Sequence, residues 1–402
     1  MALIVQKFGG SSVADKERVM RVANRIVDTY KEGNSVVVAV SAQGDTTDEL
    51  IEKAKEINPN ASKREMDMLL STGEQISIAL LAMAIESLGY PVISLTGRQA
   101  GIKCDATYGS AKINTIQVQR LRNELDQKRI VIVAGFQGIN KTDDVVTLGR
   151  GGSDTTAVAL AAALGADVCE IFTDVEGVYT ADPRIVKDAK KLDDISYDEM
   201  LELASLGANV LHNRSVEMAK KYNVNLVVRS SFNREPGTVV KEVNSVEKML
   251  VRGVTRDNDV ARIALLGIED APGEAFKIFS LLAKHNINVD IILQSIGRDT
   301  KDISFTVTES NLEKAIKLLE DNKDYIGYHE LKQRSDVSKV SIVGAGMVNN
   351  PGVAAQMFEA LYDAGINIHM ISTSEIKVSV LVNRKNAERA VAAIHDKFHL
   401  GE

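Results

Sequence analysis

The segment comprising residues 145–183 constrains the fold of this chain more than any other, because it alternates short β-branched runs with a helix. The run at residues 145–147 stops at Gly149-Arg150-Gly151-Gly152. Ser153-Asp154-Thr155-Thr156 then has the composition of a helix N-terminal cap, and an Ala- and Leu-rich helix is predicted to run to about Gly165. The order of strand, glycine turn and helix is typical of a parallel sheet.

The glycine turn predicts an anion-binding site. The first NH groups of a helix have no intrahelical partner, and the helix dipole adds partial positive charge. Glycines allow an anion to approach, and the guanidinium of Arg150 can bind a carboxylate or phosphate through two hydrogen bonds. A second apolar run at residues 168–172 ends in Thr173-Asp174, and Asp182 follows. Ligands of open parallel sheets bind at the carboxyl ends of the strands, so these features favour a metal-nucleotide site over an ordinary capped helix and turn.

Composition excludes several classes of protein. At 402 residues the chain should hold two or three domains, and 45% hydrophobic with 26% charged residues is ordinary for a globular protein. A net charge of -7 without a Lys/Arg tract argues against nucleic acid as the main partner. Cys104 and Cys169 lack the spacing of a zinc site, and we expect them to be reduced core residues of a cytoplasmic protein. No run of 18 apolar residues occurs, so we expect neither membrane insertion nor export.

The first 232 residues read as one α/β domain with a mostly parallel sheet and helices on both faces. Lys7 opens a second glycine turn, which is no P-loop because the lysine precedes the glycines. A polar loop at residues 41–47 could hold a small substrate. Residues 63–85 read as a long helix that Ser71-Thr72-Gly73-Glu74 interrupts, and Glu74 is more plausible in a site than on a solvated surface. Residues 233–246, with Pro236-Gly237, read as a linker.

The C-terminal part contains a repeat. Residues 272–295 realign with residues 351–374 at a constant offset of 79 residues, and each copy opens with Pro-Gly. Each copy reads as βαββα, which predicts two small ferredoxin-like modules that hold a ligand at the turn between the first strand and the helix. A repeat that serves dimerisation alone is the alternative.

Three motifs together resemble the signature of the aspartokinases, in the amino acid kinase family. They are Lys7-Phe8-Gly9-Gly10-Ser11-Ser12-Val13, Gly149-Arg150-Gly151-Gly152-Ser153-Asp154-Thr155-Thr156, and Phe172-Thr173-Asp174-Val175 with Ala181-Asp182-Pro183-Arg184. The Ser71–Glu74 motif and two repeats that resemble ACT domains occur in the family's order, and the resemblance covers essentially the whole chain. The sequence departs from the family where Ser11 replaces threonine, Gln43 replaces methionine and Asn213 replaces proline.

The resemblance implies a fold and a reaction. The implied fold is a kinase domain at residues 1–232, a linker at 233–250 and ACT modules at 251–335 and 336–402, with strands that can be exchanged between the modules. The implied reaction transfers the γ-phosphoryl of ATP to the β-carboxylate of L-aspartate, the first step toward lysine, threonine, methionine and diaminopimelate. A carboxylate with a pKa of about 4 needs no general base at pH 7, so such a site must mainly overcome charge repulsion and orient its substrates.

The resemblance also implies residue roles. The catalytic group is Lys7, Arg150, Asp154 and Asp174. The implied ATP and Mg²⁺ residues are Lys7, Phe8, Gly9, Gly10, Thr173, Asp174, Tyr179, Asp182 and Arg184, with Asp174 as the metal ligand. The implied aspartate residues are Ser41, Thr47, Glu74, Arg150, Gly151, Gly152, Ser153 and Asp154, with Glu74 receiving the substrate ammonium.

For the repeats, the resemblance implies feedback inhibition by an amino acid. Lysine is the first candidate effector and threonine the second, because acidic groups at Asp270, Glu274, Asp290 and Glu375 could receive the ammonium groups of lysine. The implied contacts are Asp270, Ala271, Pro272, Gly273, Glu274, Ala275, Asn288, Val289, Asp290 and Gln294 in one copy, and Val348, Asn349, Asn367, Ile368, Ser374 and Glu375 in the other. The family resemblance further implies a homo-oligomer through the ACT domains, and Met249 would allow a separate short regulatory subunit.

Two rival interpretations remain at this stage. Another amino acid kinase, acting on glutamate, carbamate or a nucleotide monophosphate, would share the sheet and Lys7 but is not expected to carry tandem ACT modules. A catalytically silent amino-acid sensor would lose the charged site, whereas Lys7, Arg150, Asp154 and Asp174 are all present.

Overall fold

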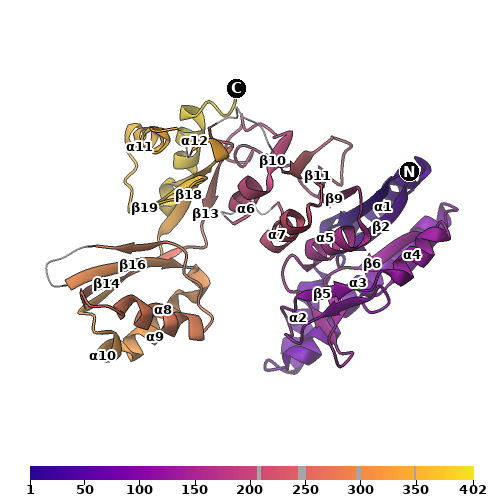
Figure 1. Cartoon of the computed structure of the whole chain (residues 1–402), viewed down its shortest axis with the longest axis horizontal. Coiled ribbons are helices and arrows are strands. Elements are labelled where there is room, and N and C mark those ends of the chain that lie inside the picture. The colour runs from indigo at the N-terminus through magenta and orange to yellow at the C-terminus, as the bar shows by residue number, and fades with distance from the viewer. Residues whose placement is uncertain (206–209, 243–249, 296–299, 348–349) are drawn as a thin grey trace. The chain divides into compact units, whose positions relative to one another are not determined.

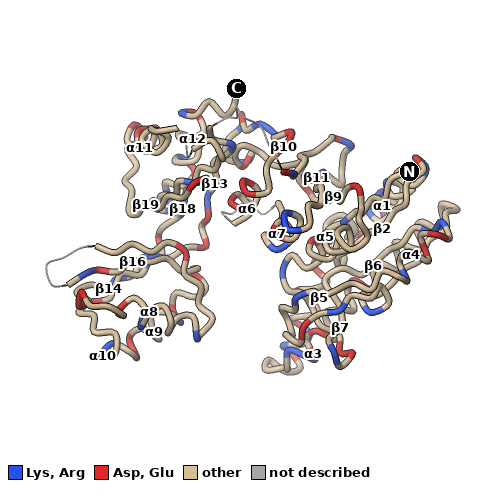
Figure 2. The backbone as a smooth tube through the Cα atoms, in the orientation of Figure 1, with Lys and Arg blue, Asp and Glu red and all other residues tan. Residues whose placement is uncertain are grey.

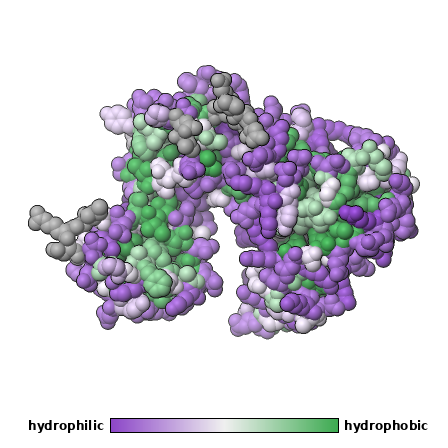
Figure 3. Space-filling model, viewed as in Figure 1, coloured by the Kyte–Doolittle hydropathy of each residue, from purple (hydrophilic) through white to green (hydrophobic). Residues whose placement is uncertain are grey.

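The computed structural model describes residues 1–205, 210–242, 250–295, 300–347 and 350–402 (Figure 1). These residues fall into two compact units. The first holds the described residues of 1–178, 191–204 and 209–244, and the second holds those of 179–190, 205–208 and 245–402. Acidic and basic residues are interspersed along the helices and loops of both (Figure 2), and hydrophilic residues cover much of the visible surface (Figure 3).

An eight-stranded sheet forms the centre of the first unit. Its order is β10-β12-β11-β9-β1-β2-β6-β3, and the strands from β11 to β3 are parallel. The predicted mostly parallel sheet is therefore confirmed. The bounds are β1 Leu3–Phe8, β2 Ser35–Val40, β3 Val92–Leu95, β6 Ile130–Ala134, β9 Val168–Thr173, β10 Asp194–Ser196, β11 Leu226–Ser230 and β12 Thr238–Lys241.

Helices cover both faces of this sheet. Val36, Val38 and Val40 of β2 pack in one core with α1 (Lys16–Lys31) and α3 (Lys63–Ser87). Side chains alternate between the faces of a strand, and α5 (Gly152–Leu164) packs on β1, β2 and β9 from the other side, with α7 (Asn213–Tyr222) behind it. The remaining helices of this unit are η1 Gly10–Val13, α2 Thr46–Ile57, α4 Gln119–Asp126 and α6 Tyr197–Ser205.

The parallel strands bring their carboxyl ends to one edge. Phe8 pairs with Val40 and Phe172, and Val40 pairs with Ala134, so the loops after β1, β2, β6 and β9 all leave the sheet there. A small second sheet of order β5-β4-β7-β8 supplies the strand that precedes α5. Its strands are β4 Ile102–Cys104, β5 Ile113–Ile116, β7 Gln137–Ile139 and β8 Val145–Thr147.

Helix α3 runs without a break, so the predicted interruption at residues 71–74 is wrong. Gly73 is needed for close packing instead, because a Cβ built on it would lie 2.8 Å from the Cβ of Ala42. By length and composition α3 could cross a membrane, and it is the one such helix among the described residues. Half of its most apolar window is buried, so we attribute its apolar character to the core.

We predict that Gly73→Ala destabilises the protein, although alanine favours a helix over glycine by about 1 kcal/mol. The clash with Ala42 should lower the free energy of unfolding by about 1–3 kcal/mol, as overpacking of a tight contact does. Urea unfolding of Gly73→Ala, Ala42→Gly and the double variant measures it. Because Ala42→Gly removes the opposing Cβ, the double variant should recover most of the loss. An additive loss in the double variant would rule out this contact as the cause.

The predicted linker is wrong in part, because residues 238–241 form strand β12. Pro236-Gly237 makes a turn in which Gly237 has φ +81°, and β12 folds back antiparallel to β11. Thr238 and Val240 are fully buried in this pairing. The alternation of buried and exposed residues over four residues was too short to separate a strand from a linker.

The second unit contains two four-stranded antiparallel sheets, each covered by helices. The first module is β15-β16-β14-β17 and the second is β13-β18-β20-β19. The strands of the two modules are β13 Gly253–Asp257, β14 Ala261–Glu269, β15 Ile292–Gln294, β16 Thr300–Val307, β17 Glu330–Arg334, β18 Val337–Val343, β19 Met370–Thr373 and β20 Lys377–Asn383. Their helices are α8 Glu274–Lys284, η2 Glu309–Asn311, α9 Leu312–Asp321, α10 Lys323–Ile326, η3 Ala345–Met347, α11 Val353–Asp363, η4 Arg384–Asn386 and α12 Ala387–Lys397.

Two segments of the second module come from elsewhere in the sequence. Strand β13 precedes the first module but pairs with β18 of the second, so the exchange of strands considered from the sequence is present. The boundary expected at residue 251 would instead have placed β13 in the first module. Residues 179–190, which follow β9 of the eight-stranded sheet in sequence, contribute Ala181 and Val186 to the core of the second module.

Candidate active site

A cavity of about 770 Å³ lies at the carboxyl edge of the parallel strands in the first unit. This volume is in the usual range for a small-molecule site. The structure brings all the residues predicted to hold the aspartate substrate into this lining, together with Lys7, Gly9 and Gly10 of the predicted nucleotide set. Those shared lining residues are Lys7, Gly9, Gly10, Ser41, Thr47, Glu74, Arg150, Gly151, Gly152, Ser153 and Asp154.

Lys7 and Asp154 form an ion pair inside the cavity. Lys7 stands on β1 beside Ala39 and Ile171, and its Nζ lies 2.8 Å from Oδ1 of Asp154 in the first turn of α5. Both side chains are nearly buried, with 12% and 13% of their surface exposed. A Cβ at Gly9 would lie 3.3 Å from this Nζ, and one at Gly10 would lie 2.6 Å from the carbonyl oxygen of Ala42. The glycines therefore leave room for a group that approaches the Lys7 ammonium.

The start of α5 differs from the predicted cap. The helix begins at Gly152, so Ser153 and Asp154 lie inside its first turn, and Gly151 is the N-cap with φ +66°. A Cβ on Gly151 would lie only 2.1 Å from Cγ of His212, whose ring packs against the turn. Glycine is thus required both by the backbone and by its neighbour. The helix ends at Gly165 with φ +67°, as predicted.

Glu74 is a buried carboxylate that faces the cavity from α3. The NH of Ala42 donates to its Oε1 at 3.1 Å, and Oε2 has no hydrogen-bond partner among the described residues. Burial raises the pKa of Glu74 to about 7, while hydrogen bonds from backbone NH groups oppose the shift. A buried carboxylate oxygen without a partner is costly, and a ligand cation would satisfy it.

Arg150 is exposed at the rim of the cavity. Among the described residues, its guanidinium makes no hydrogen bond or ion pair. It is therefore available to bind an anionic ligand with its planar fork.

The other predicted nucleotide residues lie outside this lining. The side chain of Phe8 is fully buried and stacks on Phe172 with 4.7 Å between ring centroids, so the prediction that it contacts ATP is wrong for the side chain. Thr173 ends β9 at the same edge of the sheet, and its Oγ1 donates to Oδ1 of the exposed Asp174 at 3.0 Å. Tyr179, Asp182 and Arg184 belong to the second unit, where Arg184 and Asp182 form an ion pair at 2.7 Å.

A metal ion could arrive with a nucleotide. Within the described ranges, no group of three or more His, Cys, Asp or Glu side chains could hold a metal ion. Mg²⁺ bound to substrate phosphates needs only one or two protein carboxylates. The exposed Asp174 after β9 would be one such carboxylate, whereas Asp154 already pairs with Lys7.

In the second unit, the repeat is visible in the backbone. Gly273 and Gly352 are the N-caps of α8 and α11, with φ +100° and +102°. The predicted residues 270–275 lie in and after the turn before α8, Asn288–Asp290 precede β15 and Gln294 ends it. Asn367 and Ile368 precede β19, and Ser374 and Glu375 follow it. Val348 and Asn349 lie outside the described residues.

Most of the acidic residues expected to receive an effector ammonium form ion pairs with lysines of the same chain. Asp270 pairs with Lys301 at 3.2 Å, and the buried Glu274 pairs with Lys277 at 2.8 Å. Asp290 pairs with Lys339 at 2.5 Å. A lysine effector would have to compete with these internal ion pairs.

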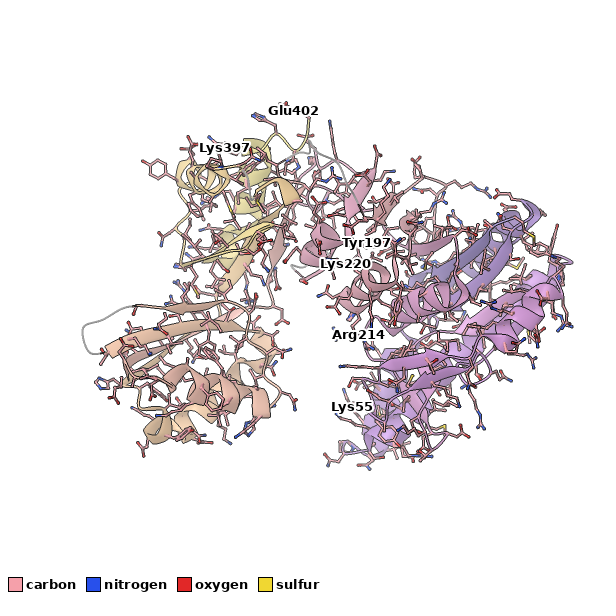
Figure 4. The ribbon with its side chains drawn as sticks, viewed as in Figure 1. Lys55, Tyr197, Arg214, Lys220, Lys397 and Glu402 are labelled. Atoms are coloured by element: carbon pink, nitrogen blue, oxygen red, sulfur yellow. The ribbon has the colours of Figure 1, made fainter. Side chains whose placement is uncertain are left out.

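Sequence reasoning missed Asp67, which lines the cavity, and Arg214, which binds the turn next to it. Asp67 is buried on α3 and accepts three hydrogen bonds. Arg214, labelled in Figure 4, lies at the start of α7 and donates to two backbone carbonyls. A charged residue on the buried face of a predicted helix was the only available signal. Asn213, which departs from the family pattern, is the first residue of α7, a position that accepts proline or other residues.

Comparison with known proteins identifies the family and agrees with the fold. The amino acid kinase family matches residues 2–230, and the ACT domain matches residues 263–322 and 340–398. The chain is 52% identical to the aspartokinase of Bacillus sp. (strain MGA3) over 402 residues, which is 100% of this chain and 98% of that protein. The crystal structure of E. coli aspartokinase III in complex with aspartate and ADP (R-state) is similar with a TM-score of 0.82 and 25% identity, covering 98% of this chain and 99% of that one. Its complex with lysine and aspartate (T-state) has a TM-score of 0.77 at the same identity and coverage.

Proposed function

The chain belongs to the amino acid kinase family, among the aspartokinases, and we propose that it transfers the γ-phosphoryl of ATP to the β-carboxylate of L-aspartate to give 4-phospho-L-aspartate. The observation that carries this proposal is one cavity lined by a nearly buried lysine, an exposed arginine, a helix N-terminus and a buried carboxylate, of which one oxygen has no partner among the described residues. These groups match an amino acid with two carboxylates and one ammonium, next to a phosphate.

The roles follow from the charges. Lys7 neutralises the transferring phosphoryl group, with the amides of Gly9 and Gly10 beside it. Arg150 binds one carboxylate of aspartate, and Ser41, Thr47 and the α5 N-terminus orient the substrate. Asp154 holds Lys7 in place through their ion pair. Mg²⁺ held by the nucleotide phosphates and Asp174 would supply further charge neutralisation.

No histidine base is needed, because the attacking carboxylate is already ionised at pH 7. The site must instead hold two anions, ATP and aspartate, close together and in one relative orientation. Phosphoryl transfer depends mainly on such positioning and electrostatic stabilisation.

We predict that aspartate binding strengthens as the pH rises from 6 to 8. Glu74 with a pKa of about 7 is mostly protonated at pH 6 and mostly ionised at pH 8, and only the carboxylate attracts the substrate ammonium. The KM for aspartate should fall about tenfold over this range. In Glu74→Gln, KM should be high and nearly independent of pH, and a wild-type pH profile in that variant would exclude Glu74 as the ammonium ligand.

The raised pKa of Glu74 also makes the free energy of unfolding depend on pH. The pKa of Glu74 is higher in the folded than in the unfolded chain, so the folded state binds more protons between these values. Its contribution to the free energy of unfolding is therefore present at low pH and is lost as the pH rises through about 7.

Regulation is proposed through the ACT modules. Lysine is the first candidate effector, supported by the lysine complex of the similar E. coli enzyme, and threonine is the second. We expect a homo-oligomer formed through these modules in the cytoplasm, and a short regulatory subunit that starts at Met249. The products would feed lysine, threonine, methionine and diaminopimelate synthesis.

The direct test is ADP release with a panel of acids, trapping acyl phosphate as the hydroxamate. Aspartate should support turnover and glutamate should not, and lysine, threonine and both together should then be added. Turnover with another acid but not aspartate would overturn the proposed substrate. Turnover unaffected by lysine and threonine would leave the reaction intact and refute the regulatory proposal.

A further inference from the structure

Asp67 accepts hydrogen bonds from backbone NH groups at the base of the turn that carries Arg150, residues 148–151. Asp67 is only 1% exposed and belongs to α3, more than seventy residues earlier in the sequence. Its Oδ2 accepts from the NH of Thr147 at 3.0 Å and from the NH of Gly109 at 2.9 Å, and its Oδ1 accepts from Oγ1 of Thr147 at 2.7 Å. One carboxylate thus fixes β8 and the loop around Gly109, both next to the cavity.

Arg214 donates hydrogen bonds to backbone carbonyls of the same region. This guanidinium donates through Nη1 to the carbonyl of Leu148 at 2.6 Å and through Nη2 to the carbonyl of Ala111 at 2.9 Å. The NH of Ala111 in turn donates to the carbonyl of Thr147 at 2.9 Å. Asp67 and Arg214 therefore bind the same two strands of backbone with complementary chemistry, since a carboxylate accepts from amides and a guanidinium donates to carbonyls.

The direction of the Arg150 side chain depends on this backbone. Its guanidinium has no hydrogen bond or ion pair among the described residues, so no contact of the side chain itself fixes its direction. Gly149 and Gly151 on either side of it have φ +76° and +66°, and glycine backbone is intrinsically permissive. The turn thus needs outside support to present Arg150 in one orientation.

We propose that Asp67 and Arg214 are positioning residues for aspartate binding, which act by clamping the turn that presents Arg150. The inference rests on the proposed function and deepens it. Asp67 lines the cavity, but its three hydrogen bonds and those of Arg214 all go to protein groups, so we assign neither residue a contact with substrate. A displacement of about 1 Å caused far from the reacting atoms can lower a rate about 10²-fold, so loosening this turn should have a measurable kinetic effect.

The test compares Asp67→Ala with Asp67→Asn in the full-length enzyme. Asparagine can keep all three bonds, because its oxygen accepts from the two amides and its NH₂ donates to the Thr147 hydroxyl. Alanine leaves both amides without a partner. We expect Asp67→Ala to raise the KM for aspartate at least about tenfold with the KM for ATP unchanged within about twofold, and Asp67→Asn to stay within about threefold of wild type for both.

The matched control is Glu124→Ala. Glu124 is a buried carboxylate of α4 in the first unit and lies outside the cavity lining. It pairs with Arg120 at 2.7 Å and with Arg129 at 2.8 Å. It should lower thermal stability and leave the aspartate KM unchanged. If Glu124→Ala raised this KM as much as Asp67→Ala, the effect would reflect general destabilisation and the clamp would be refuted.

Arg214→Lys keeps the test decisive if Asp67→Ala does not fold. Lysine keeps the charge but cannot bridge two carbonyls with a fixed fork, so the aspartate KM should rise about tenfold while the ATP KM stays constant. An unchanged aspartate KM, or an equally impaired Asp67→Asn, would overturn the clamp. If wild type fails to phosphorylate aspartate, the proposed function fails instead, so the two failures are distinguishable.

Discussion

Replacing Lys7 with alanine should lower the turnover number about 10³-fold and leave the KM for aspartate within about threefold. The Lys7 ammonium is nearly buried and lies 2.8 Å from a carboxylate of Asp154, so it is fixed before substrates bind. A fixed cation at the site of phosphoryl transfer stabilises the charge that develops in the transition state more than it stabilises bound aspartate. Steady-state kinetics with varied aspartate at saturating ATP measure both constants.

Lys55→Ala is the matched control for this variant. Lys55 is a lysine of the same unit, labelled in Figure 4, whose exposed ion pair with Glu52 spans 2.7 Å. It should keep wild-type turnover, because exposed ion pairs contribute little. A Lys7→Ala enzyme with an unchanged turnover number would remove Lys7 from the chemistry.

Gly151→Ala should abolish most activity, by about 10²-fold or more in kcat/KM. An alanine there would need φ +66°, and its Cβ would lie 2.1 Å from Cγ of His212. The backbone must then move, and the anion site at the start of α5 moves with it. Kinetics together with urea unfolding separate the loss of activity from the loss of stability.

The far end of the same helix provides the control. Gly165 has almost the same backbone angle, φ +67°, but a Cβ there meets nothing within 4 Å. Gly165→Ala should therefore lower the free energy of unfolding by about 1–2 kcal/mol and keep normal kinetics. Removing the opposing ring in Gly151→Ala/His212→Ala should restore part of the activity, and a double variant no better than the single one would show that the clash with His212 is not the cause.

Local patterns predicted much of the fold because apolar runs and glycine turns are local signals. The strands at residues 36–40 and 130–134 are buried on both faces, which a continuous β-branched run indicates directly. The 79-residue repeat predicted two ferredoxin-like modules, and its matched glycines reappear as the N-caps of α8 and α11.

Features that depend on distant packing could not be predicted from the sequence. Gly73 looks like a helix breaker until Ala42 is placed against it. Strand β13 pairs with β18, which follows the whole first module in sequence, and the five residues of β13 do not indicate which strand they pair with. The acidic residues near the effector turns looked available, whereas Lys301 and Lys339 neutralise two of them.

The site was predictable where its residues are glycines or charges in turns, as with Lys7 and the segment from Arg150 to Asp154. Asp67 and Arg214 were not predicted because they bind mainly backbone groups of other elements. The sequence does not show which elements lie next to each other. The physical difference is between a residue that faces the ligand and one that supports such a residue.

The most direct test of the central claim is a crystal structure with L-aspartate and a non-hydrolysable ATP analogue. The account predicts that a β-carboxylate oxygen of aspartate lies within about 3.5 Å of the γ-phosphorus, with Lys7 on the phosphoryl oxygens and Arg150 on a carboxylate of the amino acid. Binding of either ligand outside this cavity, or a complex in which Lys7 and Arg150 contact neither anion, would contradict it.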